Sequence, residues 1–121
     1  DTRSKLITEG KFVTTGITFD VNSATIKPAS YAVLKDIATT LSENPTVKVQ
    51  IIGHTDADGD AAQNVDLSKR RAEAVKQALI GEFGIEAGRM QTDGKGATQP
   101  VAPNTSPEGK ANNRRVEFIK L

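Results

Sequence analysis

The sequence contains no cysteine and no tryptophan, and only four Phe and one Tyr among its 121 residues. The absence of cysteine excludes disulfides, thiol catalysis and cysteine metal sites, although it does not identify the compartment. The scarcity of aromatic rings leaves few surfaces on which nucleic-acid bases could stack. Lys and Arg total 16 against 15 for Asp and Glu, so the net charge is +1 and no basic excess attracts nucleic acid.

Long hydrophobic runs are also missing, since no apolar stretch approaches the ~20 residues that cross a bilayer. We therefore expect this segment not to insert into a membrane. No charged and then apolar leader stands at the start, so we expect that any secretion signal has been removed or lies outside the sequence given. The hydrophobic fraction of 36% and charged fraction of 26% are typical of a globular protein. We expect one domain over residues 1–121, with residues 1–10 as a polar lead-in.

Hydrophobic periodicity predicts four strands and two long helices. Alternation of apolar and polar residues indicates strands at 11–19, 47–53 and 114–120, and a weaker one at 90–96. Helical spacing indicates a first helix from Pro28 to Asn44. It indicates a second helix of about two dozen residues that follows a polar loop at 54–60 and closes near Gly81 or Gly84. The Pro- and Asn-rich stretch at 100–110 predicts a loop.

The order β-α-β-α-β-β predicts an α/β fold, more specifically an α+β two-layer sandwich. Strands joined through helices run parallel by right-handed crossovers, and the last strand returns antiparallel after its loop. We expect a mixed four-stranded sheet that carries both long helices on one face.

One arginine of the second helix lies on the apolar side of that helix. On a wheel of ~100° per residue that starts at Leu67, Arg71 lies at ~40°, within a stripe formed by Ala74, Val75, Ala78 and Leu79. Lys69 and Arg70 point away from the stripe. An unpaired guanidinium on a buried face costs about 3–5 kcal/mol, so an anion must meet Arg71. That anion is either an acid of the same chain or part of a ligand.

Polar residues from four separate segments are expected at one edge of the sheet, because ligands gather beyond the carboxyl ends of parallel strands. The first strand is followed there by Asp20 and Asn22, the second by Thr55 and Asp56; the second helix brings Asn64 and the last strand Arg114. Acids, arginines and a helix N-terminus suit a zwitterionic ligand. Arginine binds its carboxylate through two parallel hydrogen bonds, and an aspartate binds its ammonium.

The spacing of these residues resembles the OmpA-like C-terminal domain found in OmpA, Pal and MotB proteins. The central match is Gly53-His54-Thr55-Asp56-x-x-Gly59 followed by Asn64-x-x-Leu67-Ser68-x-x-Arg71-Ala72-x-x-Val75. Further matches are Phe19-Asp20 before the Pro28 helix, Gly94-x-Gly96, Pro100, Asn104-x-Ser106-x-x-Gly109 and Ala111-x-Asn113-Arg114-Arg115-Val116-Glu117. The resemblance runs from about Ile17 to the C-terminus. Lys110 departs from it, since the family more often has Arg there.

The resemblance implies noncovalent binding of peptidoglycan through the diaminopimelate residue of its stem peptide. It implies that Asp56 and Arg71 hold the amino-acid head of that residue, and that Asn64, Thr55, Asp20, Asn22 and Arg114 line the pocket. It further implies the periplasm of a Gram-negative bacterium, a parent protein anchored in the outer membrane, no cofactor and no enzymatic activity. Because related domains dimerise, a weak homodimer and a protein-interaction module stay open as alternatives.

Other chemistries fit the residues less well. Asp56, Asp58 and Asp60 alternate as in a calcium loop of the EF-hand type, but Ala61 and Leu67 replace its required glycine and glutamate. A zinc site of several histidines is excluded because His54 is the only histidine. A cell-wall hydrolase built on Asp56 with His54 or Asp58 is the enzymatic alternative. We expect Asp56 to face Arg71 instead, and Ser68 has no base beside it. Gly94-Lys95-Gly96 lacks the remaining residues of a phosphate loop.

Overall fold

The structure, a computed structural model, describes residues 5–121. Its elements in chain order are η1 (Lys5–Glu9), β1 (Lys11–Thr14), η2 (Pro28–Ser30), α2 (Tyr31–Glu43), β2 (Val49–Gly53), α3 (Ala61–Phe83), η3 (Ala87–Arg89), β3 (Met90–Gly94), α4 (Pro107–Asn113) and β4 (Val116–Lys120). The strands form one sheet in the order β1-β4-β2-β3. Strand β4 runs antiparallel to both of its neighbours, and β2 runs parallel to β3.

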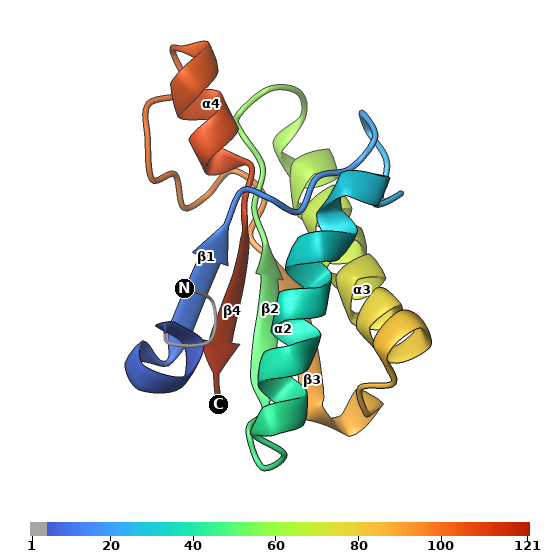
Figure 1. Cartoon of the computed structure of the whole chain (residues 1–121). Helices are drawn as coiled ribbons and strands as arrows, with labels where there is room; N and C mark the ends of the chain where they lie inside the picture. The colour runs from blue at the N-terminus through green and yellow to red at the C-terminus, as the bar shows by residue number, and fades with distance from the viewer. Residues whose placement is uncertain (1–4) are drawn as a thin grey trace.

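Helices α2 and α3 lie on the same face of this sheet (Figure 1). The expected class, a two-layer sandwich with a mixed four-stranded sheet and two long helices on one face, is therefore confirmed. Alternate residues of the strands, such as Val49, Ile51 and Phe118, face the helices and are fully buried. The helices complete this core with side chains at helical spacing, and those that are fully buried include Leu34, Ile37, Leu41, Val75 and Leu79. Each such side chain contributes about 1.5–3 kcal/mol by its burial.

Helix α3 begins and ends at the residues that its sequence favours. The side chain of Asp60 accepts a hydrogen bond from the Gln63 amide at 2.9 Å, which caps the N-terminus. Gly84 ends the helix in the left-handed conformation, with φ of 69°. The second helix therefore has the predicted length and closes at the second of the two glycines considered.

Two glycines at the ends of neighbouring strands let α3 lie directly against the sheet. A Cβ atom at Gly53 or Gly94 would collide with the α3 backbone at Ser68, and at Gly94 also with that of Lys69. The Ser68 hydroxyl accepts a hydrogen bond from the Gly96 amide at 2.9 Å. The N-terminal half of α3 is thereby fixed at the edge of the sheet where β2 and β3 end.

The first strand is shorter than predicted, because it ends at Thr14 rather than Phe19. The Thr14 hydroxyl accepts a hydrogen bond from the Gly16 amide at 2.9 Å, which turns the chain away from the sheet. The alternation continues beyond the turn because Ile17 still packs into the core and Phe19 pairs with Ile26 in an isolated bridge. The alternating pattern therefore continues from Lys11 to Phe19, but only its first half, Lys11–Thr14, forms a strand of the sheet.

The expected lead-in and the expected loop at 100–110 both contain helical structure. Residues Lys5–Glu9 form a turn of π-helix whose Leu6 is fully buried, and residues 1–4 of the lead-in lie outside the described residues. Helix α4 starts inside the expected loop, so the assignment of Pro107 to Lys110 to a loop was wrong. Ser106 caps it by accepting from the Gly109 amide at 3.0 Å, and a proline at the first position favours the start.

The remaining element bounds differ by a few residues from the prediction. Strand β2 starts at Val49, β3 ends at Gly94, and β4 starts at Val116 rather than Arg114. The first predicted helix is divided, with a 3-10 turn at Pro28–Ser30 before α2. Arg114 therefore belongs to the short connection between α4 and β4 rather than to the last strand.

Candidate functional site

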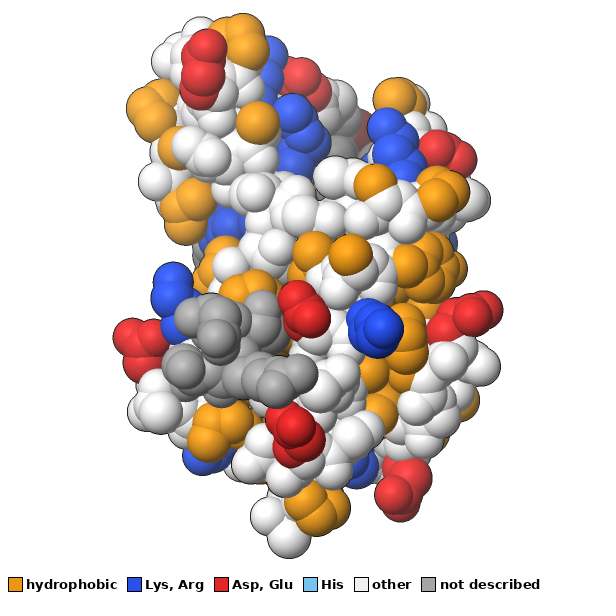
Figure 2. Space-filling model, in the orientation of Figure 1, with side chains coloured by type: hydrophobic (Ala, Val, Ile, Leu, Met, Phe, Trp, Pro, Cys, Tyr) orange, Lys and Arg blue, Asp and Glu red, His pale blue; other side chains and the backbone are white. Residues whose placement is uncertain are grey.

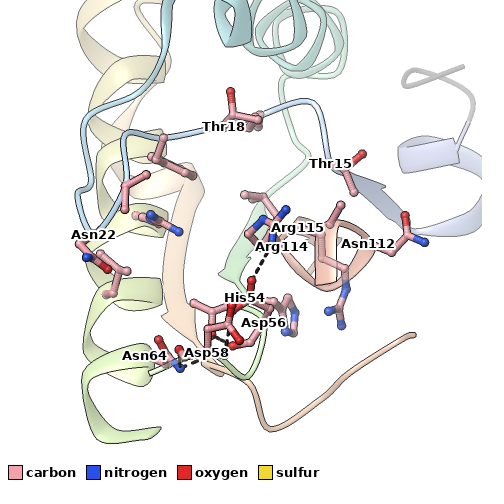
Figure 3. A pocket seen from close by; sticks show the side chains of 18 of the residues that line it. Thr15, Thr18, Asn22, His54, Asp56, Asp58, Asn64, Asn112, Arg114 and Arg115 are labelled. Atoms are coloured by element: carbon pink, nitrogen blue, oxygen red, sulfur yellow. Dashed lines mark hydrogen bonds and ion pairs between the residues drawn. The ribbon is translucent and has the colours of Figure 1, made fainter. Parts of the chain in front are cut away.

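A cavity of about 690 Å³ opens at the edge of the sheet where β2 ends and β4 begins. Four segments line it: the connection after β1, the loop after β2, the first half of α3, and the segment from the end of α4 into β4. Figure 3 shows polar side chains from these segments facing one another across the opening. The labelled ones are Thr15, Thr18, Asn22, His54, Asp56, Asp58, Asn64, Asn112, Arg114 and Arg115.

Asp56 lies in the loop after β2 and is only 9% exposed. One carboxylate oxygen accepts a hydrogen bond from the Asp58 amide at 3.0 Å. The other accepts from Arg114 Nη1 at 2.6 Å, in an ion pair drawn as a dashed line in Figure 3. Asp56 therefore pairs with Arg114, and our expectation that it faces Arg71 in a direct contact was wrong.

Arg71 instead binds backbone carbonyl groups of the loop that follows β1. Its Nε donates to Ser23 O at 2.8 Å and its Nη2 to Asp20 O at 3.2 Å, while the guanidinium carbon lies 4.9 Å from the centre of the Phe19 ring. These partners are neutral, and within residues 5–121 the guanidinium makes no ion pair with a carboxylate. Arg71 thus remains a half-buried cation whose charge is stabilised only by dipoles and one aromatic ring.

Burial also lowers the pKa of Arg71. Loss of solvent and, secondly, the charge of Arg70 lower the pKa of its guanidinium, and the Asp56 carboxylate opposes this shift through space.

The helical wheel correctly separated Arg71 from the two cations before it, Lys69 and Arg70. Arg70 is exposed and pairs with Asp66 one turn earlier at 2.8 Å, and Lys69 is exposed as well.

The loop that binds Arg71 owes its shape to Asn22, which has a positive φ of 53°. Asparagine is among the few residues that adopt this conformation readily. The Ser23 amide donates to Asp20 O at 3.1 Å, which closes the turn. The turn directs the carbonyl groups of Asp20 and Ser23 toward Arg71. Asn22 lines the cavity, whereas Asp20 contributes its backbone oxygen and is absent from the lining.

Two of the expected site residues shape the Asp56 loop. The Thr55 hydroxyl donates to Asp56 O at 2.8 Å, and the Thr55 amide donates to Gly96 O at 2.9 Å. The Asn64 side-chain amide donates to Asp58 O at 2.9 Å. Both residues line the cavity; the Asn64 side chain holds the loop against α3, and the Thr55 backbone amide holds it against the turn after β3.

His54 and Arg115 of the cavity wall belong to a largely buried ionic cluster that was not predicted from the sequence. Arg115 and Glu117 are 5% and 6% exposed, and Arg115 Nη2 lies 3.2 Å from Glu117 Oε1. The same oxygen lies 2.6 Å from His54 Nε2, although this contact lacks the alignment of a hydrogen bond, and Lys11 Nζ lies 3.0 Å from the other oxygen. The sequence held a signal for it, because Arg115 directly precedes β4 and Glu117 lies two residues later in that strand, which pairs with β1, the strand of Lys11.

The cluster perturbs the ionisation of two of its members. Burial and, secondly, the positive charge of Arg115 lower the pKa of His54. Burial alone would raise the pKa of Glu117, but the hydrogen bond from Lys11, the charge of His54 when it is protonated, and the charges of Lys11 and Arg115 hold it below its ordinary value. At neutral pH the cluster thus combines a neutral imidazole and an ionised carboxylate with two cations.

Lys27 also lines the cavity and was not among the expected site residues. It precedes Pro28 in an extended conformation, and its amide donates to Thr18 O at 2.9 Å. No periodic signal in the sequence marks Lys27, because it lies in an irregular connection whose path depends on the turn at Asn22.

Within the described part of the chain, no group of three or more His, Asp or Glu side chains is placed to hold a metal ion. Among the helices of residues 5–121, none combines the length and the apolar character that a membrane span requires.

Comparison with known proteins identifies the family. The model of the OmpA family matches residues 18–114, a range that includes part of every segment of the cavity wall. The chain belongs to the OmpA family. Its fold is shared with the solved peptidoglycan-associated lipoprotein of Burkholderia pseudomallei, with 30% identity, a TM-score of 0.78, and coverage of 87% of this chain and 88% of that one.

Two curated relatives contain a segment similar to this chain within a longer protein. "Probable lipoprotein YiaD" of Escherichia coli is 46% identical over 102 residues, covering 84% of this chain and 46% of that protein. "Peptidoglycan-binding protein ArfA" of Mycobacterium tuberculosis is 39% identical over 103 residues, covering 85% of this chain and 31% of that protein. The chain therefore spans less than half the length of these relatives.

Proposed function

We propose that this chain binds peptidoglycan noncovalently, through the diaminopimelate residue of the stem peptide, and is not an enzyme. It thereby anchors the protein to which it belongs to the cell wall. The site of action is the periplasm of a Gram-negative bacterium, and the parent protein is held in the outer membrane. Similarity to a peptidoglycan-binding protein and to a peptidoglycan-associated lipoprotein supports this proposal.

The observation that carries the proposal is the state of Arg71. It is a half-buried guanidinium that borders a large cavity, and it makes no ion pair within the described residues. A ligand carboxylate would supply the missing charge, and guanidinium groups bind carboxylates by two parallel hydrogen bonds. The free end of diaminopimelate carries such a carboxylate beside an ammonium group. Asp56 is the acid available to the ammonium, which would share it with Arg114 or displace Arg114.

The two neighbouring arginines of α3 provide a matched test. Sedimentation with purified sacculi should be lost in Arg71→Ala and retained in Arg70→Ala, because only the first side chain reaches the cavity. Asp56→Ala should also lose binding. Circular dichroism establishes that each variant is folded. A folded Arg71→Ala variant that sediments like the parent would place the site elsewhere, and release of soluble fragments from the sacculi would indicate an enzyme.

Stem chemistry tests the choice of diaminopimelate. A lysine stem keeps the ammonium but lacks the second carboxylate, so Arg71 would keep no anionic partner. The loss should be about 2–5 kcal/mol, or ~30-fold or more in affinity. Calorimetric titration with a diaminopimelate tripeptide and its lysine counterpart measures the difference. Equal affinities for the two stems would contradict the assignment of Arg71 to that carboxylate.

A further inference from the structure

The charges that line the cavity do not balance. Its two acids already have cationic partners, since Asp56 pairs with Arg114 at 2.6 Å and Asp58 with Lys110 at 3.2 Å. Arg115, in the wall, is paired with Glu117. Figure 2 shows Lys and Arg side chains at this end of the molecule, beside α4 and on the opposing loop, with Asp and Glu side chains near them.

Two lining cations remain without an acid. Arg71 binds only carbonyl groups and the Phe19 ring. Lys27 is exposed, and in the described range 5–121 its ammonium group has no hydrogen bond or ion pair. Its backbone is nevertheless fixed, by the bond from its amide to Thr18 O and by the proline that follows. Lys27 is therefore an exposed, unpaired cation that lines the cavity on a fixed backbone.

The zwitterionic head of diaminopimelate brings one carboxylate and one ammonium, which satisfies Arg71 and leaves Lys27 unused. The cavity is also larger than one amino-acid head requires, because about 690 Å³ lies within the ~300–1,000 Å³ typical of sites for much larger ligands. The unused volume indicates that a neighbouring part of the ligand also enters the cavity. The unpaired charge of Lys27 indicates that this part is anionic.

We propose that Lys27 binds a second free carboxylate of the stem peptide, outside the diaminopimelate head. This inference rests on the proposed function. Two stem groups have the required chemistry: the α-carboxylate of the γ-linked glutamate that precedes diaminopimelate, and the terminal carboxylate of the alanine that follows it. The domain would then distinguish stems by their amidation, because an amide at the bound position offers Lys27 no charge.

The test is a titration of the 121-residue chain with three synthetic tetrapeptide stems: unmodified, with isoglutamine in place of the glutamate, and with an amidated C-terminal alanine. The parent is compared with Lys27→Met and with the control Lys35→Met, whose exposed lysine lies on α2 outside the cavity lining. We expect one amidation to weaken binding to the parent and to the control about two- to fivefold, as for an exposed ion pair. Lys27→Met should bind the unmodified stem about two- to fivefold more weakly than the parent does. The same amidation of the stem should not lower the affinity of Lys27→Met any further.

The amidation that weakens binding to the parent identifies which of the two carboxylates Lys27 binds. The inference is overturned if Lys27→Met, shown to be folded, binds the unmodified stem as tightly as the parent, or if amidation weakens the variant as much as the parent. Failure of the proposed function would look different, because the parent would then not bind the unmodified stem at all. The Lys27-dependent difference should also shrink when NaCl is raised from about 0.05 to 0.5 M, since salt screens exposed charges.

Discussion

Glu117 is the acid of the buried ionic cluster, and replacing it with glutamine removes one negative charge with little change of shape. Arg115 would then be a guanidinium with 4% side-chain exposure and no carboxylate partner. Breaking a buried pair in this way costs about 3–5 kcal/mol. Arg115 keeps two carbonyl acceptors, Gln99 O at 2.8 Å and Asn113 O at 3.3 Å, so the cost should lie near the lower limit. Lys11 is 53% exposed and adds less than about 1 kcal/mol.

We therefore expect Glu117→Gln to lower the free energy of unfolding by about 3 kcal/mol, and to lower the Tm by about 10 °C. Urea denaturation at pH 7, followed by circular dichroism, measures the change. The control is Asp66→Asn, which breaks the exposed pair with Arg70 and should cost no more than about 0.5 kcal/mol. If the two variants lose the same free energy of unfolding, the buried cluster is not held together by the charge of Glu117.

Two further predictions concern stability. Because burial lowers the pKa of His54, the unfolded chain binds a proton there more readily than the folded chain, and the free energy of unfolding should fall as pH decreases below 6.5. His54→Asn should make that fall shallower between about pH 5 and 7, measured by urea titrations at a series of pH values. Gly94→Ala should cost about 1–3 kcal/mol in the same assay, because its Cβ would collide with the α3 backbone. Gly81→Ala is its control, since a Cβ there meets nothing within 4 Å and alanine favours the helix by about 0.5–1 kcal/mol. A lower free energy of unfolding in both variants would contradict the reasoning.

The fold was largely predictable because its main elements have strong local signals. The 23-residue helix α3 carries an N-cap aspartate, a long apolar stripe and a terminal glycine, and each acts within a few residues. Helix α4 was missed although Ser106-Pro107 is a favourable start, because a seven-residue helix has too few turns to show a periodic stripe. The end of β1 at Thr14 depends on a side-chain hydrogen bond, which an alternating pattern cannot reveal.

The sequence predicted that six of the seven expected residues would come together around one cavity, but it predicted neither Lys27 and the ionic cluster nor which pairs form. The orientation of Arg71 followed from helical phase alone. Its partners did not, because they are carbonyl groups of a turn whose path is set by the positive φ of Asn22. The pairing of Asp56 with Arg114 likewise depends on α4, which shortens the connection to β4 and brings Arg114 over the Asp56 loop.

The direction of the strands has a mechanical consequence if the domain anchors its parent protein as proposed. The cavity lies beyond the ends of β1 and β2 and the start of β4, whereas Leu121 lies at the other end of the sheet, where its amide bonds Lys48 O and the Lys120 amide bonds Gly10 O. Figure 1 shows the C-terminus and η1, the first described element, away from the α4 edge. Under the proposed function, tension between a bound wall polymer and the C-terminal end would run along the strands. It would load the hydrogen bonds of the β1–β4 and β4–β2 pairs in shear, all at once, rather than opening them one after another.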